Sequence, residues 1–493
     1  MSLAELPCHA ALHVISDIHM GGELGFQILR ETGRLSNYLL RLGAERPGDQ
    51  IALVLNGDVF DTLAEELGGS YIAIDQVQRV VTRIMDDHSF SPVWAALTKF
   101  VGTPNRTLVF VIGNHDTEIA FPAVQHLIRW RLAGDDLAAR ARIEFSSTGA
   151  GYTCMIGNAR VYCTHGNEVD AWNYNRYEDL ARVGRRLNAG QAFNPGDWRP
   201  NAGTKMVKDV MNTVKRRYAW IDLLKPETSA AVGTLLVVDP GQMKKLGELL
   251  DIIGEKLRGS SEIDGRLSLE GFVDPVKGQE QASFEQLLGP NLRAAQAERV
   301  LVDDMLLASE LQMTMPAGAA SEGTLGTGQL IMDRLTGWIR GVDKPEALRR
   351  ALKDWLKGDK TFDVTTQDET CVDVLKTVGP AVDVVITGHT HLARAIDLGG
   401  GRMYFNSGTW IRLMRFSEAM LRDKSTFEPI YDLLMDGRMA SLDAAEFGEQ
   451  PVLLDCTTEV EIVAGDTGIV GRLNRIDGDG RGAPICVSEI RRS

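Results

Sequence analysis

The sequence lacks long apolar runs, a signal peptide and an excess of basic residues, and each absence argues against one class of protein. No segment reaches the about 18 consecutive apolar residues of a membrane-spanning helix, so we predict no transmembrane segment. Residues 1–13 lack the basic and apolar regions of a signal peptide, and we expect a cytoplasmic protein. The net charge of -14 argues against general polyanion binding, although a local basic groove remains compatible with it.

Cysteine is also scarce, and no C-x-x-C pair occurs among the 6 cysteines. They are therefore interpreted as reduced, mostly buried thiols and not as a zinc or disulfide framework. The 493 residues are enough for a large core and suggest two to three domains.

Five short runs rich in Val, Ile and Leu are typical of buried strands, and polar residues follow each of them closely. The runs are 11–15, 51–55, 108–112, 161–163 and 382–386. In an open α/β sheet the ligand crevice lies beyond the carboxyl ends of the strands. We therefore expect the polar residues after these runs to meet in one pocket.

Seven of these polar residues are candidate metal ligands: Asp17, His19, Asp58, Asn114, His165, His389 and His391. Oxygen and imidazole ligands without thiolate suit Mn, Fe(II), Zn or Co better than Cu(I) or an iron-sulfur cluster. Seven ligands exceed the needs of one tetrahedral or facial-triad site, so two ions are predicted. Asp58 could bridge them at about 3.5 to 4 Å, the spacing of two-metal hydrolases.

The five motifs that carry these ligands resemble, in order, the signature of the calcineurin-like metallophosphoesterases: D-x-H, G-D-x-x-D, G-N-H-[DE], H-x and G-H-x-H. The resemblance covers residues 9–170 and 380–416. It implies an αββα sandwich of two mixed sheets. It also implies a division of the ligands, with Asp17, His19 and His391 on one metal, Asn114, His165 and His389 on the other, and Asp58 between them.

The same resemblance implies that His115 acts as an outer-sphere acid or stabilises the charge of the phosphate, with Asp61 or Asp116 orienting its ring. The expected cofactors are two divalent ions, with Mn favoured and Fe, Zn, Co or Ni as alternatives. A hydroxide that bridges two such ions can attack phosphorus in line. The predicted activity is hydrolysis of a phosphodiester, pyrophosphate or phosphomonoester.

We predict a core formed by residues 1–170 and 380–450, a helical insertion at 171–379 that caps the site, and a small β-rich C-terminal appendage at 451–493. Helical patterns occupy 171–187, 205–224, 241–258, 283–313, 328–339 and 345–356, and a flexible connection is expected at 316–327. The basic residues from Lys205 to Arg217 could contact phosphate or form a solvated helix face. Asp209 and Asp222 interrupt them, which favours the solvated face.

Candidate substrate contacts follow His165 closely in the chain: Asn167, Glu168, Asp170, Asn173 and Arg176. Capping of a helix by the acidic residues is the competing interpretation.

Two further segments, N-S-G-T-W at 406–410 and H-G-N-E-V-D at 165–170, resemble the UDP-2,3-diacylglucosamine pyrophosphatase subgroup. The chain departs from that subgroup at His115, where the subgroup has Arg, and in its large insertion. A small-molecule substrate is favoured over nucleic acid. The alternatives are an SbcD-type DNA nuclease and a metal-stabilised scaffold that binds a partner without turnover. A protein phosphatase is disfavoured because Thr62 stands where that family has a phosphate-gripping Arg.

Overall fold

The computed structural model describes residues 6–65, 77–192, 198–225, 230–231, 233–239, 343–448, 450–465 and 468–492. The helices predicted at 241–258, 283–313 and 328–339 and the connection predicted at 316–327 lie outside these residues.

Two mixed sheets form the centre of the described fold. The larger sheet contains, in spatial order, β17 (Ile485–Arg492), β16 (Ile469–Arg475), β15 (Thr458–Ala464), β2 (Ala11–Ile15), β3 (Ile51–Asn56), β4 (Arg106–Val111) and β5 (Ile143–Ser146). The smaller sheet contains β1 (Cys8–His9), β6 (Tyr152–Ile156), β7 (Ala159–Cys163), β8 (Val384–Thr387), β10 (Arg402–Asn406) and β9 (Arg394–Gly399). All five predicted strands are present, with ends that differ by at most two residues.

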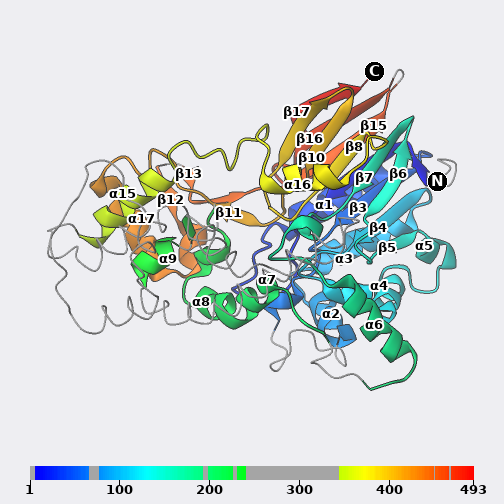
Figure 1. Ribbon diagram of the computed structural model, residues 1–493, viewed down its shortest axis with the longest axis horizontal. Helices are drawn as coiled ribbons and strands as arrows, with labels where there is room; N and C mark the ends of the chain where they lie inside the picture. Colours follow the sequence, from blue (N-terminus) through cyan, green and yellow to red (C-terminus); the bar gives the residue numbers. More distant parts are fainter. Residues whose placement is uncertain are drawn as a thin grey trace, which may run out of the picture.

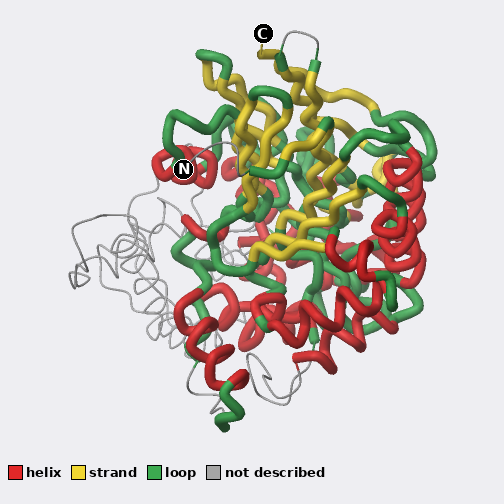
Figure 2. Tube along the Cα trace, turned by 90° about the vertical axis from the view of Figure 1, so that its right-hand side faces the viewer, coloured by secondary structure: helices red, strands yellow, loops and turns green. Residues whose placement is uncertain are grey.

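The two sheets pack face to face through an apolar core that includes Val14, Val54, Val161 and Ile386. The other face of the larger sheet is covered by α1 (Thr32–Ala44), α3 (Ser91–Gly102) and α4 (Pro122–Ala133). The other face of the smaller sheet packs on α16 (Glu369–Thr377). Figures 1 and 2 show the strands gathered in one part of the molecule with helices outside them. The expected αββα sandwich of two mixed sheets is thus the observed fold.

Further helices on the side of the larger sheet are α2 (Val77–Asp86), α5 (Leu137–Ala141) and α6 (Tyr177–Asn188). The predicted helix at 171–187 begins later, at Tyr177, because Asp170 holds the preceding residues in a non-helical turn. Its carboxylate accepts a hydrogen bond from the Trp172 backbone N–H at 2.9 Å.

The C-terminal strands were expected to form a separate appendage, but β15 pairs antiparallel with β2 and so extends the larger sheet. Val460 lies opposite Val14, and both side chains are fully buried in the core between the sheets. The C-terminal segment is therefore β-rich and also part of the central fold.

A second lobe lies beside the sandwich, to the left in Figure 1. Its elements are α8 (Asn212–Lys215), α9 (Gly233–Val238), α15 (Lys344–Trp355), β11 (Arg412–Met414), α17 (Lys424–Asp436), α18 (Met439–Ala444), β12 (Glu446–Phe447), β13 (Gln450–Pro451) and β14 (Leu453–Asp455). The short helix α7 (Ala202–Lys205) precedes them, and the Gly203 backbone N–H donates to the Trp172 carbonyl at 2.7 Å. Val214, Trp220 and Leu348 share one apolar core with Leu413, Phe427 and Leu453. The core residues between Ile411 and Leu453 thus pack with residues of the insertion, whereas the sequence prediction assigned 380–450 to the sandwich.

The helix predicted at 205–224 is divided in the structure. A π-helix (Met206–Met211) joins α7 to α8, and a 3-10 helix (Ala219–Asp222) follows. None of the helices in the described part of the chain is long and apolar enough to cross a membrane.

Candidate metal centre

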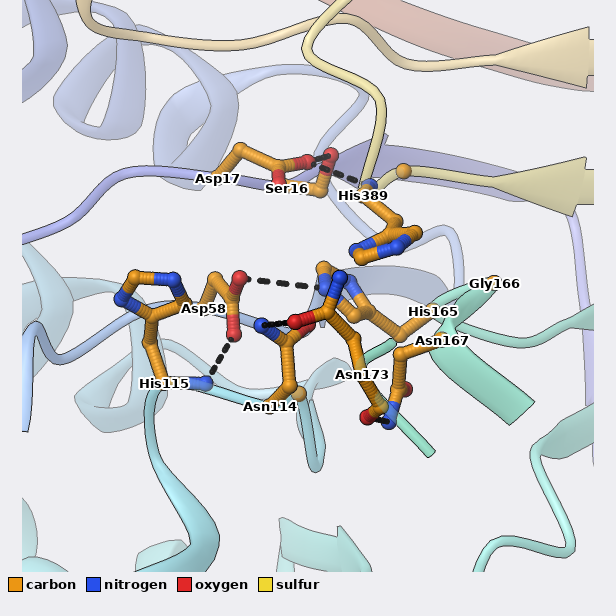
Figure 3. Close-up of polar contacts among 12 residues, drawn as sticks. Ser16, Asp17, Asp58, Asn114, His115, His165, Gly166, Asn167, Asn173 and His389 are labelled. Atoms are coloured by element: carbon orange, nitrogen blue, oxygen red, sulfur yellow. Dashed lines mark hydrogen bonds and ion pairs between the residues drawn. The ribbon is translucent and has the colours of Figure 1, made fainter. Parts of the chain in front are cut away.

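Figure 3 shows the candidate ligands Asp17, Asp58, Asn114, His165 and His389. All seven candidate ligands lie in loops that follow β2, β3, β4, β7 and β8, where strand ends of the two sheets meet. Five of them have a positive φ between 51° and 70°, namely Asp17, His19, Asp58, His389 and His391. A non-glycine residue in this conformation costs about 1–3 kcal/mol and persists only where its surroundings hold it in place. Only two other non-glycine residues in the described part of the chain share it, so the strain is concentrated at this site.

Two glycines allow the ligand loops to approach one another closely. A Cβ at Gly57, whose φ is +89°, would lie 2.2 Å from Nδ1 of His165. A Cβ at Gly113 would lie 2.1 Å from Oδ1 of Asp58. These glycines of the G-D and G-N motifs are therefore required by close packing against ligands from other loops.

The Asp17, His19 and His391 side chains form the first group, with ligand atoms all within 4.8 Å of one another. Oδ1 of Asp17 lies 3.3 Å from Nε2 of His391. The Nε2 atoms of His19 and His391 face each other at 3.1 Å. Only one of two such neutral nitrogens can be a donor, and a shared cation would satisfy both lone pairs.

Asp58 lies between this group and His165. Its Oδ2 is 3.2 Å from Nε2 of His165 and 3.9 Å from Nε2 of His19. Its Oδ1 accepts a hydrogen bond from the His115 backbone N–H at 2.8 Å (Figure 3). Nδ1 of His165 hydrogen-bonds the Asn56 carbonyl at 2.7 Å, which leaves Nε2 as the ligand nitrogen.

His389 and Asn114 complete the set on the side of His165. The His389 and His165 rings meet edge to face, with centroids 5.3 Å apart. Nε2 of His389 hydrogen-bonds Asp170 at 2.8 Å, so that Nδ1 is the nitrogen left for a ligand. Oδ1 of Asn114 is buried and accepts no hydrogen bond from the described residues.

The chemistry of this group fits divalent cations. A buried oxygen such as Oδ1 of Asn114 normally accepts a hydrogen bond, and here a bound ion would take the place of the missing donor. Burial and the charge of His115 lower the pKa of His19 to about 3, which keeps its imidazole in the neutral, metal-binding form. Burial lowers the pKa of His165, but the charge of Asp58 and the hydrogen bond between the two side chains raise this pKa to about 10. The carboxylates thus favour positive charge at the position that a cation would take.

His115 lies beside the ligand group, with a side chain that is 21% exposed. Its Nδ1 hydrogen-bonds Oδ1 of Asp61 at 2.9 Å. Asp116, the other candidate for this role, does not contact the ring. Asp116 instead accepts hydrogen bonds from the backbone N–H groups of Gly113 at 2.7 Å and Val59 at 2.8 Å, and so joins two ligand loops.

Asp170 and Asn173, two of the five predicted substrate contacts, lie against candidate ligands. Asp170 contacts His389, as described above, and Oδ1 of Asn173 accepts from Nδ2 of Asn114 at 3.5 Å. Both side chains therefore help to orient the ligand group.

The other three predicted substrate contacts bind neighbouring backbone. Asn167 is fully buried, and its Nδ2 donates to the carbonyl of Asn173 at 3.0 Å. Glu168 accepts from the Gly166 backbone N–H at 2.7 Å. Arg176 donates to the carbonyls of Arg199 and Pro200 at 2.9 and 2.8 Å.

Ser16 supports the site and was missed in the sequence, whereas Asn406 and Ser407 belong to the N-S-G-T-W segment named there. Ser16 hydrogen-bonds both the Asp17 carboxylate and the Ser407 hydroxyl, the latter at 2.7 Å. Nδ2 of Asn406 donates to the carbonyl of Gly388 at 2.7 Å and so holds the G-H-T-H loop. The position of Ser16 directly after β2 and before Asp17 is the signal that could have identified it.

The two mixed sheets and the His/Asp cluster agree with the expectation of a metal-dependent phosphoesterase. Residues 11–205 match the family model of calcineurin-like phosphoesterases, which supports membership of this superfamily. The match includes every candidate ligand up to His165 and ends at Lys205, the last residue of α7. A search of curated proteins found no match.

Proposed function

We propose that this protein hydrolyses a small-molecule phosphodiester or pyrophosphate with the help of two divalent ions, Mn²⁺ being the first to test. The observation that carries the proposal is the position of the Asp58 carboxylate between His19 and His165, the two halves of the ligand group. Two ions bound there would polarise phosphoryl oxygens and activate a water for in-line attack.

Besides the residues that would bind the metal ions, we assign a part in the hydrolysis to His115. Burial lowers the pKa of this imidazole, but the charge of Asp58 and the hydrogen bond to Asp61 raise it to about 9. Because Nδ1 is engaged by Asp61, the remaining Nε2–H is the group that can donate. His115 then stabilises the equatorial phosphoryl oxygens or protonates the leaving oxygen.

The preference for a small molecule rests on charge and on the neighbouring lobe. The net charge of -14 disfavours a long polyanion. Residues of the second lobe contact the segment that carries Asp61: Nδ2 of Asn212 donates to the Leu63 carbonyl at 2.9 Å. A lobe this close to the metal site restricts the access of large substrates, and small-molecule sites are typically enclosed in this way. The resemblance of 406–410 to UDP-2,3-diacylglucosamine pyrophosphatases makes nucleotide sugars the first substrates to test.

The test is a substrate panel with metal-stripped and Mn²⁺-loaded protein. The substrates are p-nitrophenyl phosphate, bis(p-nitrophenyl) phosphate, nucleotide sugars, and single- and double-stranded DNA. We expect metal-dependent hydrolysis of the bis ester and of a nucleotide sugar, and little cleavage of DNA. Preferential DNA cleavage would favour a nuclease, and metal binding without any turnover would favour a scaffold.

A further inference from the structure

The turn at residues 170–173 joins two candidate ligands that come from different loops. Oδ2 of Asp170 lies 2.8 Å from Nε2 of His389 and accepts a hydrogen bond from Nδ2 of Asn173 at 2.7 Å. Oδ1 of Asn173 accepts from Nδ2 of Asn114 at 3.5 Å, and Figure 3 shows these two side chains facing each other. The turn therefore connects the loop after β4 to the loop after β8.

Buried asparagines of the next residues hold the loop of Asn114 from the same side. Nδ2 of Asn175 donates to the carbonyl of Gly113, the residue before Asn114, at 2.8 Å. Nδ2 of Asn201 donates to Oδ1 of Asn175 at 3.5 Å, and Oδ1 of Asn201 caps α7 by accepting from the Thr204 backbone N–H at 2.7 Å. Both asparagines are buried, so these hydrogen bonds are shielded from water. The position of α7 is thus tied to the ligand loop.

Gly203, in α7, leaves the space that the Asn173 side chain occupies. A Cβ at Gly203 would lie 1.9 Å from Oδ1 and 2.9 Å from Cγ of Asn173. The Gly203 backbone N–H donates to the Trp172 carbonyl at 2.7 Å, which fixes the helix against the turn. Because α7 is an α-helix, its backbone conformation suits any residue. The glycine is therefore required by the position of Asn173 and not by its own dihedral angles.

These contacts decide which atoms of two ligands are left for a cation. Asn114, His165 and His389 are assigned to one ion, which we call the second ion. Since Nδ2 of Asn114 donates to Asn173, Oδ1 is the atom that can face this ion, and it accepts no hydrogen bond from the described residues. Asp170 holds Nε2 of His389 in the same way and leaves Nδ1. Partners of this kind are worth about 10- to 100-fold in metal affinity.

We propose that Asp170 and Asn173, with Gly203 providing the space for the amide, are positioning residues that set the affinity of the second ion. The inference rests on the two-ion part of the proposed function and deepens it, because it assigns the occupancy of one half of the metal centre to the start of the insertion. None of the three residues touches metal or substrate in this assignment.

The first test is Gly203→Ala, which changes no ligand and no hydrogen-bonding group. Equilibrium dialysis against Mn²⁺ with metal analysis measures the two dissociation constants. We expect one Kd to rise about 10- to 100-fold because the new Cβ displaces the Asn173 amide, with the other Kd unchanged. The matched control is Gly184→Ala in α6, where a Cβ would meet nothing within 4 Å and both constants should stay as in the wild type.

The second test asks whether Gly203 acts through Asn173. Asn173→Ala alone should raise the same Kd by a similar factor, and it keeps the inference testable if Gly203→Ala folds poorly. On the Asn173→Ala background, Gly203→Ala should add little, because the two atoms nearest to the new Cβ are then absent. In both single variants, hydrolysis of bis(p-nitrophenyl) phosphate should be low at limiting Mn²⁺ and return towards the wild-type rate at saturating Mn²⁺.

A third measurement identifies the ion that is weakened. His391→Ala removes a ligand of the group formed with Asp17 and His19, so the ion that this variant retains is the second ion. Gly203→Ala should raise the Kd of that ion. On a His165→Ala background, where the second ion has lost a ligand, Gly203→Ala should leave the Kd of the remaining ion unchanged.

The outcomes separate this inference from the proposed function. Unchanged constants for both ions in Gly203→Ala and Asn173→Ala overturn the inference, and so does an equal loss of both ions. A wild type that shows the expected binding but hydrolyses none of the substrate panel overturns the proposed function and leaves the inference standing. A wild type that binds no second ion overturns both.

Discussion

At the residue scale, the site depends on backbone conformations that ordinary side chains avoid. The left-handed φ at Asp17, His19 and Asp58 turns these side chains inward directly after a strand. Hydrogen bonds from neighbouring loops hold the strained backbone, such as that from the His389 backbone N–H to Asp17 at 3.0 Å. Loss of one ligand therefore affects the loops as well as the ions.

We predict that Asp58→Asn and His165→Ala each lower metal content and abolish hydrolysis. Asp58 contacts both halves of the ligand group, and His165 has its ring fixed by the Asn56 carbonyl, so no neighbour can replace either. Metal analysis and turnover of the aryl ester measure the effect. Full activity in both variants would contradict the two-metal assignment.

His115→Ala should have a different signature, with metals retained and kcat reduced by about 10² to 10⁴, the range for general acid-base groups. The reason is that the ring hydrogen-bonds Asp61 and makes its contact with Asp58 only through the backbone N–H, which alanine keeps. Parallel metal analysis provides the control. Loss of metal together with activity would identify His115 as a ligand.

The sequence predicted these residues because each ligand follows a strand and a glycine or polar turn. It could not predict where side chains point within a turn. Arg176 lies close to His165 in the chain, yet it is turned to the carbonyls of 199–200. Asp61 and Asp116 were indistinguishable by spacing, and only the hydrogen bond to the ring at Asp61 separates them.

At the element scale, a buried ion pair joins β2, β15 and α1. Nδ1 of His13 lies 3.0 Å from Glu459, which also accepts hydrogen bonds from Tyr38 on α1 and from Asn474 on β16. Burial lowers the pKa of His13, but the hydrogen bond and charge of Glu459 raise it above 6.5. Burial raises the pKa of Glu459, but the hydrogen bond and charge of His13 lower it below 4.5.

The pair should therefore stabilise the fold most between pH 4.5 and 6.5, the ordinary pKa values of the two groups. The histidine contribution is lost as pH rises from 6.5 through the raised pKa, and the carboxylate contribution is lost as pH falls from 4.5 through the lowered one. We predict that Glu459→Gln costs about 3–5 kcal/mol near pH 5.5, as breaking a buried pair does, and less near pH 8.5. Urea unfolding of metal-free protein at both pH values measures this. An equal cost at both would mean that His13 is neutral in the folded protein.

The strands themselves were predictable because a sheet covered on both faces requires continuous apolar runs. The order in which these strands pair could not be predicted. β15 meets β2 across most of the chain, and nothing local in 458–464 specifies that partner. The late start of α6 has a similar origin, since the turn around Asp170 is fixed by contacts with His389 and not by helix propensity.

At the scale of the whole molecule, the apolar core of the second lobe is built from segments that lie far apart in the chain. Trp220 is fully buried there, and its Nε1 donates to the Leu434 carbonyl at 2.9 Å. Arg412 joins this lobe to the loop after β2, through an ion pair with Asp443 and a hydrogen bond to the Gln27 carbonyl. The sequence predicted an insertion at this point but could not show that residues 411–453 complete its core.

This architecture changes what a truncation should do. Replacing residues 205–360 with a linker would remove half of an apolar core and expose the buried faces of α17 and β11, so we expect that variant to aggregate. Replacing only residues 241–340 with a Gly/Ser linker of about 20 residues, flexible enough to join the ends, keeps every described residue of that core. The shorter deletion should bind metal and hydrolyse the small aryl ester at close to the wild-type rate. Size-exclusion chromatography, metal analysis and kcat for both deletions measure the difference. If the shorter deletion folds and binds metal but turns over nothing, residues 241–340 contribute a catalytic group, and the assignment of the chemistry to residues of the sandwich is incomplete.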